Sequence, residues 1–172
     1  MKRKKAIIFG ISGQDGAYLS NFLLKKNYEV FGTTRNKSKK NLYRLQKLNI
    51  LNKVKLIKCS FVSIKFVDSL LKKNKNIQEI YYLAGEPSVT KSFKNPENSI
   101  KTNTVGILNI LLSIKKIKKK IKVFNASSAQ IFGNNKDNFY SEYSNIAPST
   151  PYAVSKRLCL RIKSVNAFLR QS

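Results

Sequence analysis

The chain has 172 residues, of which 42% are hydrophobic, and a formal net charge of +26. This length supports one substantial hydrophobic core, so we expect a single globular domain over residues 1–172. The apolar run before Gly10 is too short to span a bilayer, so we expect a cytoplasmic protein with neither leader nor membrane anchor. The chain has no histidine and two widely separated cysteines, which predicts reduced thiols and no metal site.

The positive charge raises the question of a nucleic-acid partner. Lysines are spread through nearly every segment, and only six of the 34 basic residues are arginines, the residue expected for bidentate phosphate and base recognition. Drift towards A/T-rich codons, which also favours Asn and Ile, accounts for the excess. We therefore expect no specific nucleic-acid partner, although weak, salt-sensitive adsorption to polyanions is expected.

Short β-rich runs alternate with segments of helical period along the chain. Strands are predicted at residues 5–9, 29–33, 54–59, 79–83 and 122–126, and helices at residues 16–26, 62–73, 100–118 and 151–168. Residues 133–150 show no sustained period. The alternation predicts an α/β fold with a Rossmann-type, doubly wound parallel sheet.

Three glycines at a period of three follow the first predicted strand and precede the first helix. Without side chains, Gly10, Gly13 and Gly16 would allow a tight turn, and the helix N-terminus could direct its free N–H groups at a pyrophosphate. The sequence therefore predicts a dinucleotide site here. A purely structural turn is the alternative.

The end of the second predicted strand bears on the choice of cofactor. An acidic residue there would bind the ribose 2′-hydroxyl of NAD, whereas an arginine accommodates the 2′-phosphate of NADP. The chain has Arg35 at this point and no carboxylate between Glu29 and Asp68. These residues favour NADP, unless Arg35 is simply one more basic residue in a basic protein.

Tyr152 and Lys156 are spaced to share one face of the last predicted helix. The ammonium can favour the phenolate electrostatically, which makes the tyrosine a usable base. Ser128 follows the fifth predicted strand, at the carboxyl edge where ligands bind in open α/β sheets. Its hydroxyl could hold a substrate hydroxyl against Tyr152, or it could simply cap a turn.

In order and spacing, these motifs resemble the extended short-chain dehydrogenases/reductases. The resemblance rests on the glycine turn, the Tyr-x-x-x-Lys pair, the Ser128 region, Tyr82-Leu83-Ala84-Gly85 and Asn103-Thr104-Val105-Gly106. Within that superfamily, the Gly13-Gln14-Asp15-Gly16 loop and the segments at 83–89 and 148–154 most resemble the GDP-mannose 4,6-dehydratase family.

The resemblance implies a reaction and a set of site residues. Tyr152 would take the proton from the sugar 4-hydroxyl, with Lys156 supporting the phenolate, while hydride passes from C4 to the nicotinamide. Loss of water across C5 and C6 and return of that hydride to C6 would give a GDP-4-keto-6-deoxy sugar and regenerate the cofactor. NADP would lie against Gly10, Ser12, Gly13, Gln14, Asp15, Gly16, Arg35, Leu83, Ala84, Gly85, Tyr152 and Lys156. The nucleotide sugar would contact Glu86, Ser88 and Ser128, and Ser128, Gln130, Tyr152 and Lys156 would form the catalytic set. The resemblance also implies a homo-oligomer in full-length relatives.

One departure from the family pattern concerns the elimination step. The family has a glutamate two residues after the active-site Ser or Thr, but this chain has Gln130, which cannot accept a proton as a general base. Glu86 stands where the family more often has glutamine. Either Glu86 partly replaces the missing base, or both changes reflect independent drift.

The other departure concerns length, because in the extended family a smaller C-terminal portion forms much of the sugar-nucleotide pocket. This chain continues for only sixteen residues beyond Lys156. We therefore expect the substrate-binding portion to be absent and activity to be impaired. Two other interpretations stay open: another nucleotide-sugar epimerase or dehydratase of the superfamily, and a non-catalytic NADP-binding fragment.

Overall fold

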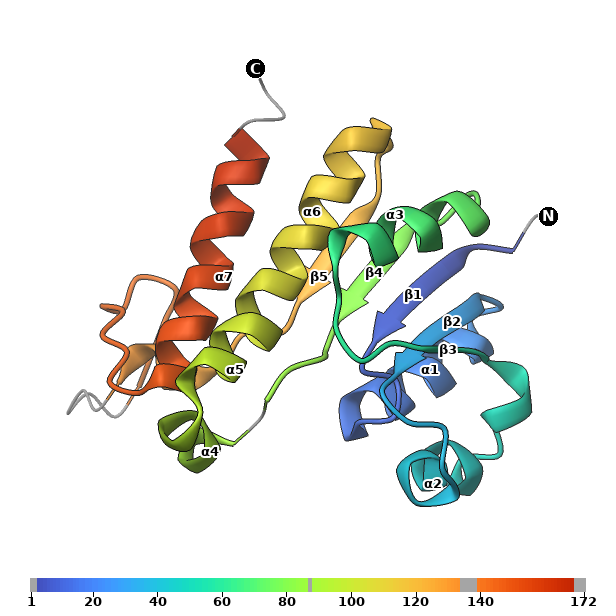
Figure 1. Ribbon diagram of the computed structural model, residues 1–172, viewed down its shortest axis with the longest axis horizontal. Helices are drawn as coiled ribbons and strands as arrows, with labels where there is room; N and C mark the ends of the chain where they lie inside the picture. Colours follow the sequence, from blue (N-terminus) through green and yellow to red (C-terminus); the bar gives the residue numbers. More distant parts are fainter. Residues whose placement is uncertain (1–2, 87, 134–138, 169–172) are drawn as a thin grey trace. The chain divides into compact units, whose positions relative to one another are not determined.

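The computed structural model describes residues 3–86, 88–133 and 139–168, with side chains as far as residue 162 (Figure 1). The strands are β1 (Lys5–Phe9), β2 (Glu29–Thr34), β3 (Lys55–Lys58), β4 (Glu79–Tyr82) and β5 (Lys122–Asn125). The α-helices are α1 (Gln14–Lys25), α2 (Lys39–Lys47), α3 (Ile64–Lys73), α4 (Val89–Lys94), α5 (Pro96–Ile100), α6 (Gly106–Ile117) and α7 (Pro151–Phe168). The alternation of strands and helices confirms the predicted α/β class.

The five strands form one parallel sheet in the order β3-β2-β1-β4-β5. This is the Rossmann-like topology that the sequence predicts. The central strand β1 pairs Ile7 with Phe31 on one side and with Ile80 on the other. Residues 6–9 are fully buried, as expected for a parallel strand that is covered on both faces.

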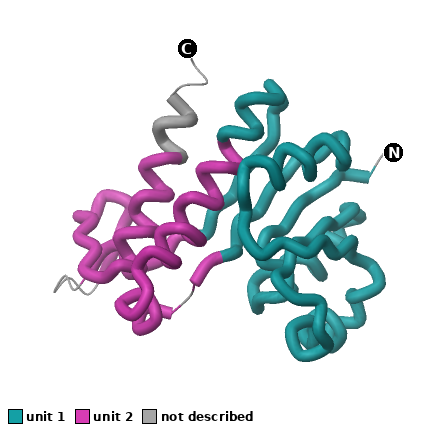
Figure 2. Tube along the Cα trace, in the orientation of Figure 1, with its two compact units in different colours: residues 1–84, 112–126 teal, residues 85–111, 127–172 magenta. Residues whose placement is uncertain are grey.

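The chain divides into two compact units (Figure 2). Unit 1, residues 1–84 and 112–126, contains the whole sheet, and unit 2, residues 85–111 and 127–172, is helical. In unit 1, Ala6 and Ile8 of β1 pack with Ala17 and Leu23 of α1 in a hydrophobic cluster. Two α2 side chains, Leu42 and Leu45, belong to the same cluster, so α1 and α2 pack against the same face of β1.

Asparagine closes three helix-to-strand connections. Asn27, Asn49 and Asn76 have φ values of 62°, 53° and 67°, in the left-handed region. After α1, the N–H of Tyr28 bonds the carbonyl of Leu23 across the turn, the arrangement that ends many helices. Asparagine tolerates this backbone better than most residues, so these connections form without glycine.

The helix α2 is absent from the sequence-based prediction. Its N-cap is Ser38, whose hydroxyl accepts from the N–H of Asn41 at 3.4 Å. Leu42 and Leu45 lie on its buried side. The cap and the leucine spacing are both present in the sequence, but the lysine-rich surroundings mask them.

The predicted helix at 100–118 is also wrong at its start. Helix α5 begins earlier, at Pro96, because Asn95 caps it by accepting from the N–H of Asn98 at 3.0 Å and proline suits the first helical position. Residues Lys101–Val105 then form a π-helical turn that leads into α6. The shorter β3 and β5 and the earlier start of α1 are smaller differences of boundary.

Both cysteines are buried free thiols, as expected from their spacing. Among the described residues, no group of histidine, cysteine or carboxylate side chains could hold a metal ion. Over the same residues, no helix is both long and apolar enough to cross a bilayer.

Candidate functional site

The turn between β1 and α1 requires glycine at two positions. Gly10 has φ +87°, and a Cβ on it would lie 2.9 Å from the backbone nitrogen of Ala84 and 3.0 Å from the carbonyl carbon of Leu83. A Cβ on Gly16 would run into the carbonyl oxygen of Gly10. The turn therefore lies tightly against the start of its own helix and against the residues that follow β4.

The start of α1 offers backbone donors. The first turn-closing bond of the helix runs from the N–H of Ala17 to the carbonyl of Gly13, at 3.0 Å, so the N–H groups of residues 14–16 precede the hydrogen-bonded ladder. Gly13 is the N-cap and has no side chain to occupy those donors. Such an end attracts a phosphate through its N–H groups and the helix dipole.

A polar network joins this turn to the end of β2. The Ser12 hydroxyl lies 3.1 Å from that of Thr34, and the Asn41 amide donates to Thr34 at 2.8 Å and to Ser12 at 3.3 Å. Arg44 donates to the Ser12 carbonyl at 3.4 Å. Asn41 and Arg44 were not predicted as site residues, because both lie on the unpredicted helix α2.

The exposed Arg35 directly follows β2. With Arg44 close to the glycine turn, this part of unit 1 carries cationic side chains. A tight glycine turn, a helix N-terminus with free N–H groups and nearby arginines fit the phosphates of a dinucleotide. In unit 1, the predicted cofactor residues Gly10, Gly13, Gly16, Ser12, Leu83 and Ala84 thus lie close together around the turn between β1 and α1.

In unit 2, helix α7 carries Tyr152 and Lys156. Thr150 precedes its first turn and accepts from the N–H of Ala153 at 3.1 Å, and Pro151 occupies the first helical position. The Lys156 Nζ lies 5.7 Å from the centroid of the Tyr152 ring. Burial lowers the pKa of Lys156, which is half-buried.

Ser92 fixes the start of α7 from α4. Its hydroxyl accepts from the N–H of Tyr152 at 3.1 Å and donates to the carbonyl of Val89 at 2.6 Å. Ser92 is fully buried. The backbone of Tyr152 is therefore held by a residue distant in sequence.

The predicted serine lies beyond the strand, since β5 ends at Asn125. Ser128 caps the 3-10 turn Ala129–Phe132, and its hydroxyl accepts from the N–H of Gln130 at 3.3 Å. The half-buried serine still retains a hydroxyl hydrogen to donate, and Gln130 is exposed. The roles of Ser128 in substrate binding and catalysis, and of Gln130 in catalysis, stay predictions.

Glu86 and Ser88 belong to the segment that leads into α4. The N–H of Ser88 donates to the Glu86 carboxylate at 3.3 Å, and the Ser88 hydroxyl caps α4 by accepting from the backbone N–H of Lys91 at 3.2 Å. Gly85 lies beside the pair on α7, because the Lys156 Nζ is 3.9 Å from where a Gly85 Cβ would stand. Unit 2 thus contains the predicted catalytic and substrate-binding residues, with Gly85.

Comparison with known proteins assigns the family. The family model described as GDP-mannose 4,6 dehydratase matches residues 7–164. The chain belongs to the GDP-mannose 4,6-dehydratase family. Among its relatives, GDP-mannose 4,6 dehydratase 2 of Caenorhabditis elegans is 35% identical over 164 residues, which are 90% of this chain and 43% of the relative. The GDP-mannose 4,6-dehydratase of Vibrio cholerae serotype O1 is 33% identical, over 91% of this chain and 43% of its own length.

Solved structures agree with the family fold. The UDP-Glc/GlcNAc 4-epimerase of Campylobacter jejuni superposes with a TM-score of 0.85 at 23% identity, covering 96% of this chain and 50% of that enzyme. The dTDP-glucose 4,6-dehydratase DesIV of Streptomyces venezuelae, solved with NAD and TYD bound, gives a TM-score of 0.79 at 19% identity, over 94% and 51%. At these identities the likeness concerns the fold alone. The chain spans under half the length of the curated dehydratases it matches.

Proposed function

We propose that this chain carries the oxidising half of a GDP-mannose 4,6-dehydratase and works with NADP. The proposal rests chiefly on the pair of Tyr152 and Lys156 on α7, in a chain that belongs to this dehydratase family. The Lys156 Nζ lies 5.7 Å from the centroid of the Tyr152 ring. The family relationship supports a nucleotide sugar as substrate. Homo-oligomerisation is proposed only by analogy with full-length relatives.

The glycine turn and its neighbours would hold the dinucleotide. The pyrophosphate would meet the N–H groups at the start of α1, where the N-cap Gly13 has no side chain to occupy them, while Gly10 and Gly16 allow the turn to pack tightly. Arg35 and the absence of any carboxylate between Glu29 and Asp68 in the sequence support NADP over NAD. When bound, the nicotinamide supplies a reversible acceptor for the hydrogen at the sugar C4.

Tyr152 would take the proton of the sugar 4-hydroxyl on its phenolate oxygen. Lys156, as the ammonium, would stabilise that phenolate, and its partial burial strengthens the interaction because few waters screen it. The Ser128 hydroxyl, which the capping bond leaves with a hydrogen to donate, would orient the sugar oxygen.

The elimination of water needs a base for the C5 proton, and Gln130 has no titratable carboxyl. Glu86 is the carboxylate in the segment between β4 and α4, where the N–H of Ser88 bonds it. We propose that Glu86 takes part of this role. If it does not, the elimination step is slow.

Gln130 also favours a second candidate function, that of a nucleotide-sugar 4-epimerase. Epimerisation at C4 uses the tyrosine and the reversible oxidation but needs no base at C5. A non-catalytic NADP-binding fragment is the remaining possibility.

The test is to incubate the purified chain and NADP with GDP-mannose and, in parallel, with UDP-glucose, and to follow products by mass and by chromatography. Loss of one water from GDP-mannose alone is the expected result. Isomerisation without a change of mass would support the epimerase. Bound NADP without turnover of either sugar would leave a cofactor-binding fragment.

A further inference from the structure

In unit 2, the π-helical turn Lys101–Val105 and helix α7 contact each other through buried polar groups, where apolar contacts would be usual. Asn103 and Thr104 of the π-helical turn are 1% and 6% exposed, and Ser155 and Cys159 of α7 are 0% and 1% exposed. Single π-helical turns inside helices are rare overall, and those that occur are often found at functional sites. Buried polar contacts tend to fix one arrangement of the elements that share them.

Ser155 is the centre of these contacts. Its hydroxyl donates to the carbonyl of Tyr152 at 2.7 Å and accepts from the Asn103 amide at 2.9 Å. Its own carbonyl accepts from the Thr104 hydroxyl at 2.9 Å. One side chain therefore joins the π-helical turn to the backbone of the residue proposed as the base.

A neighbouring contact fixes the next turn of α7. The Cys159 thiol donates to the carbonyl of Asn103 at 2.8 Å. This bond reaches a main-chain carbonyl inside the π-helical turn, so α7 is tied to that turn at Ser155 and again four residues later. Tyr152 and Lys156 lie on the stretch of helix between the start of α7 and this second tie.

The Asn103 side chain packs closely against Gly85. A Cβ at Gly85 would run into Oδ1 of Asn103 and stand 3.9 Å from the Lys156 Nζ. The Oδ1 is buried and has no hydrogen-bond partner among the described residues. The side-chain amide of Asn103 is therefore held through its donor nitrogen, towards Ser155, while its oxygen lies close to Gly85.

We propose that Ser155 is a positioning residue: through Asn103 and Thr104 it sets the placement of Tyr152 and Lys156 for proton transfer. It touches neither substrate nor cofactor in this account. The inference rests on the proposed function for its catalytic consequence, but the placement of Tyr152 can be measured without turnover.

The experiment compares Ser155→Ala with Ser99→Ala in the full chain. Ser99 is a matched control, because it is also fully buried in unit 2 and its hydroxyl has no partner among the described residues. Tyrosines are replaced by 3-fluorotyrosine, and Tyr152→Phe assigns the Tyr152 fluorine resonance. We expect that resonance to shift or broaden in Ser155→Ala and to stay unchanged in Ser99→Ala.

The activity measurement separates this inference from the proposed function. If the parent chain turns over GDP-mannose, we expect kcat of Ser155→Ala to fall about tenfold, because the hydroxyl's bonds to the Tyr152 carbonyl and from the Asn103 amide are both lost, with KM within about twofold. If the parent chain does not turn it over, the proposed function fails, and the fluorine spectrum still decides whether Ser155 positions Tyr152.

A lower unfolding midpoint with an unchanged Tyr152 resonance would overturn the inference, because a merely structural serine gives that result. An unchanged kcat in an active chain would also overturn it. If Ser155→Ala does not fold, Thr104→Val replaces it, since that change keeps the shape and removes the donor to the Ser155 carbonyl, together with a long 3.9 Å contact from the Cys159 thiol. The same shift of the Tyr152 resonance is then expected, and its absence overturns the inference.

Discussion

The Lys156 Nζ lies 5.7 Å from the centre of the Tyr152 ring, one helical turn further along α7. The four-residue spacing alone predicts a shared face, but the proximity also depends on the start of the helix at Pro151, after the Thr150 cap. Ser92 and Ser155 hold the backbone of Tyr152 at its N–H and its carbonyl. The pair is thus fixed by residues that the motif does not include.

Tyr152→Phe removes the phenol oxygen and keeps the ring. We expect turnover of the nucleotide sugar to fall by at least about a hundredfold, the usual contribution of a positioned proton acceptor. Binding of NADP, followed by fluorescence or calorimetry, should stay within a few-fold of the parent. Retained turnover would remove Tyr152 from the proposed chemistry.

Gly10→Ala tests the glycine turn against Gly13→Ala. At Gly10 the left-handed backbone and the 2.9 Å approach to Ala84 predict a loss of about 2 kcal/mol or more in the free energy of unfolding. At Gly13 a Cβ would have only the Gly10 carbonyl oxygen near it, at 3.3 Å, so we expect a loss below about 1 kcal/mol. Urea unfolding without cofactor measures both, and equal losses would refute this account of the turn.

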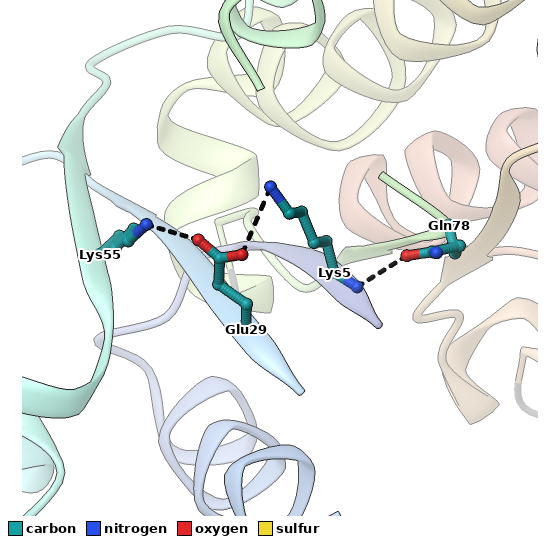
Figure 3. Close-up of polar contacts among 4 residues, drawn as sticks. All are labelled: Lys5, Glu29, Lys55 and Gln78. Atoms are coloured by element: carbon teal, nitrogen blue, oxygen red, sulfur yellow. Dashed lines mark hydrogen bonds and ion pairs between the residues drawn. The ribbon is translucent and has the colours of Figure 1, made fainter. Parts of the chain in front are cut away.

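Glu29 links three strands at the amino edge of the sheet (Figure 3). It pairs with Lys55 of β3 and, at 3.3 Å, with Lys5 of β1, while the Lys5 N–H donates to Gln78 at 2.7 Å. The bond from Lys55, followed by Lys5, lowers the pKa of Glu29. Because the folded pKa is the lower one, this stabilisation is present above the pKa of the unfolded chain and is lost as pH falls through the folded value.

We therefore expect Glu29→Gln to cost about 0.5–1 kcal/mol of unfolding free energy at pH 7, as for partly exposed ion pairs. The difference from the parent should shrink as pH falls below about 4.5. Glu142→Gln, a change at an exposed position outside the helices and strands, serves as the control. A difference that persists unchanged at acid pH would contradict this assignment.

Both thiols should react slowly in the folded chain. Burial raises the pKa of Cys59 to about 11, and Cys159 is 1% exposed. At pH 8 we expect Cys59 to react with a disulfide reagent at least about a hundredfold more slowly than in guanidinium, where an ordinary thiol pKa returns. Rapid reaction of either thiol without unfolding would show that its part of the fold opens readily.

Gln130→Glu and Glu86→Gln test the elimination step. Restoring a carboxyl at residue 130 should raise the rate of water loss, because the side chain can then accept the C5 proton. Glu86→Gln should lower it if Glu86 serves as the substitute base. An unchanged rate of water loss in Glu86→Gln would remove Glu86 from the mechanism.

The sequence predicts the sheet well, because its strands are short apolar runs bounded by turns and its parallel class follows from the alternation with helices. It misses α2, where lysines on the exposed side conceal the leucine spacing. It also misses the π-helical turn, since local pattern does not distinguish i→i+5 from i→i+4 bonding.

The same limit applies to the site. The glycines, Tyr152 and Lys156 can be predicted because fixed spacing encodes their chemistry. Asn41, Arg44, Asn103 and Ser155 contribute through partners that are distant in sequence, for example the 2.9 Å bond from Asn103 to Ser155. No local pattern in one sequence reports such contacts.

The most direct test of the proposed function uses GDP-mannose that carries deuterium at C4, incubated with NADP and the parent chain, with Tyr152→Phe as control. We expect a product that is lighter by one water and retains the deuterium, now at C6, and no such product from the control. Deuterium that returns to C4 without loss of water would indicate an epimerase, and no conversion with NADP bound would contradict the proposed lyase activity.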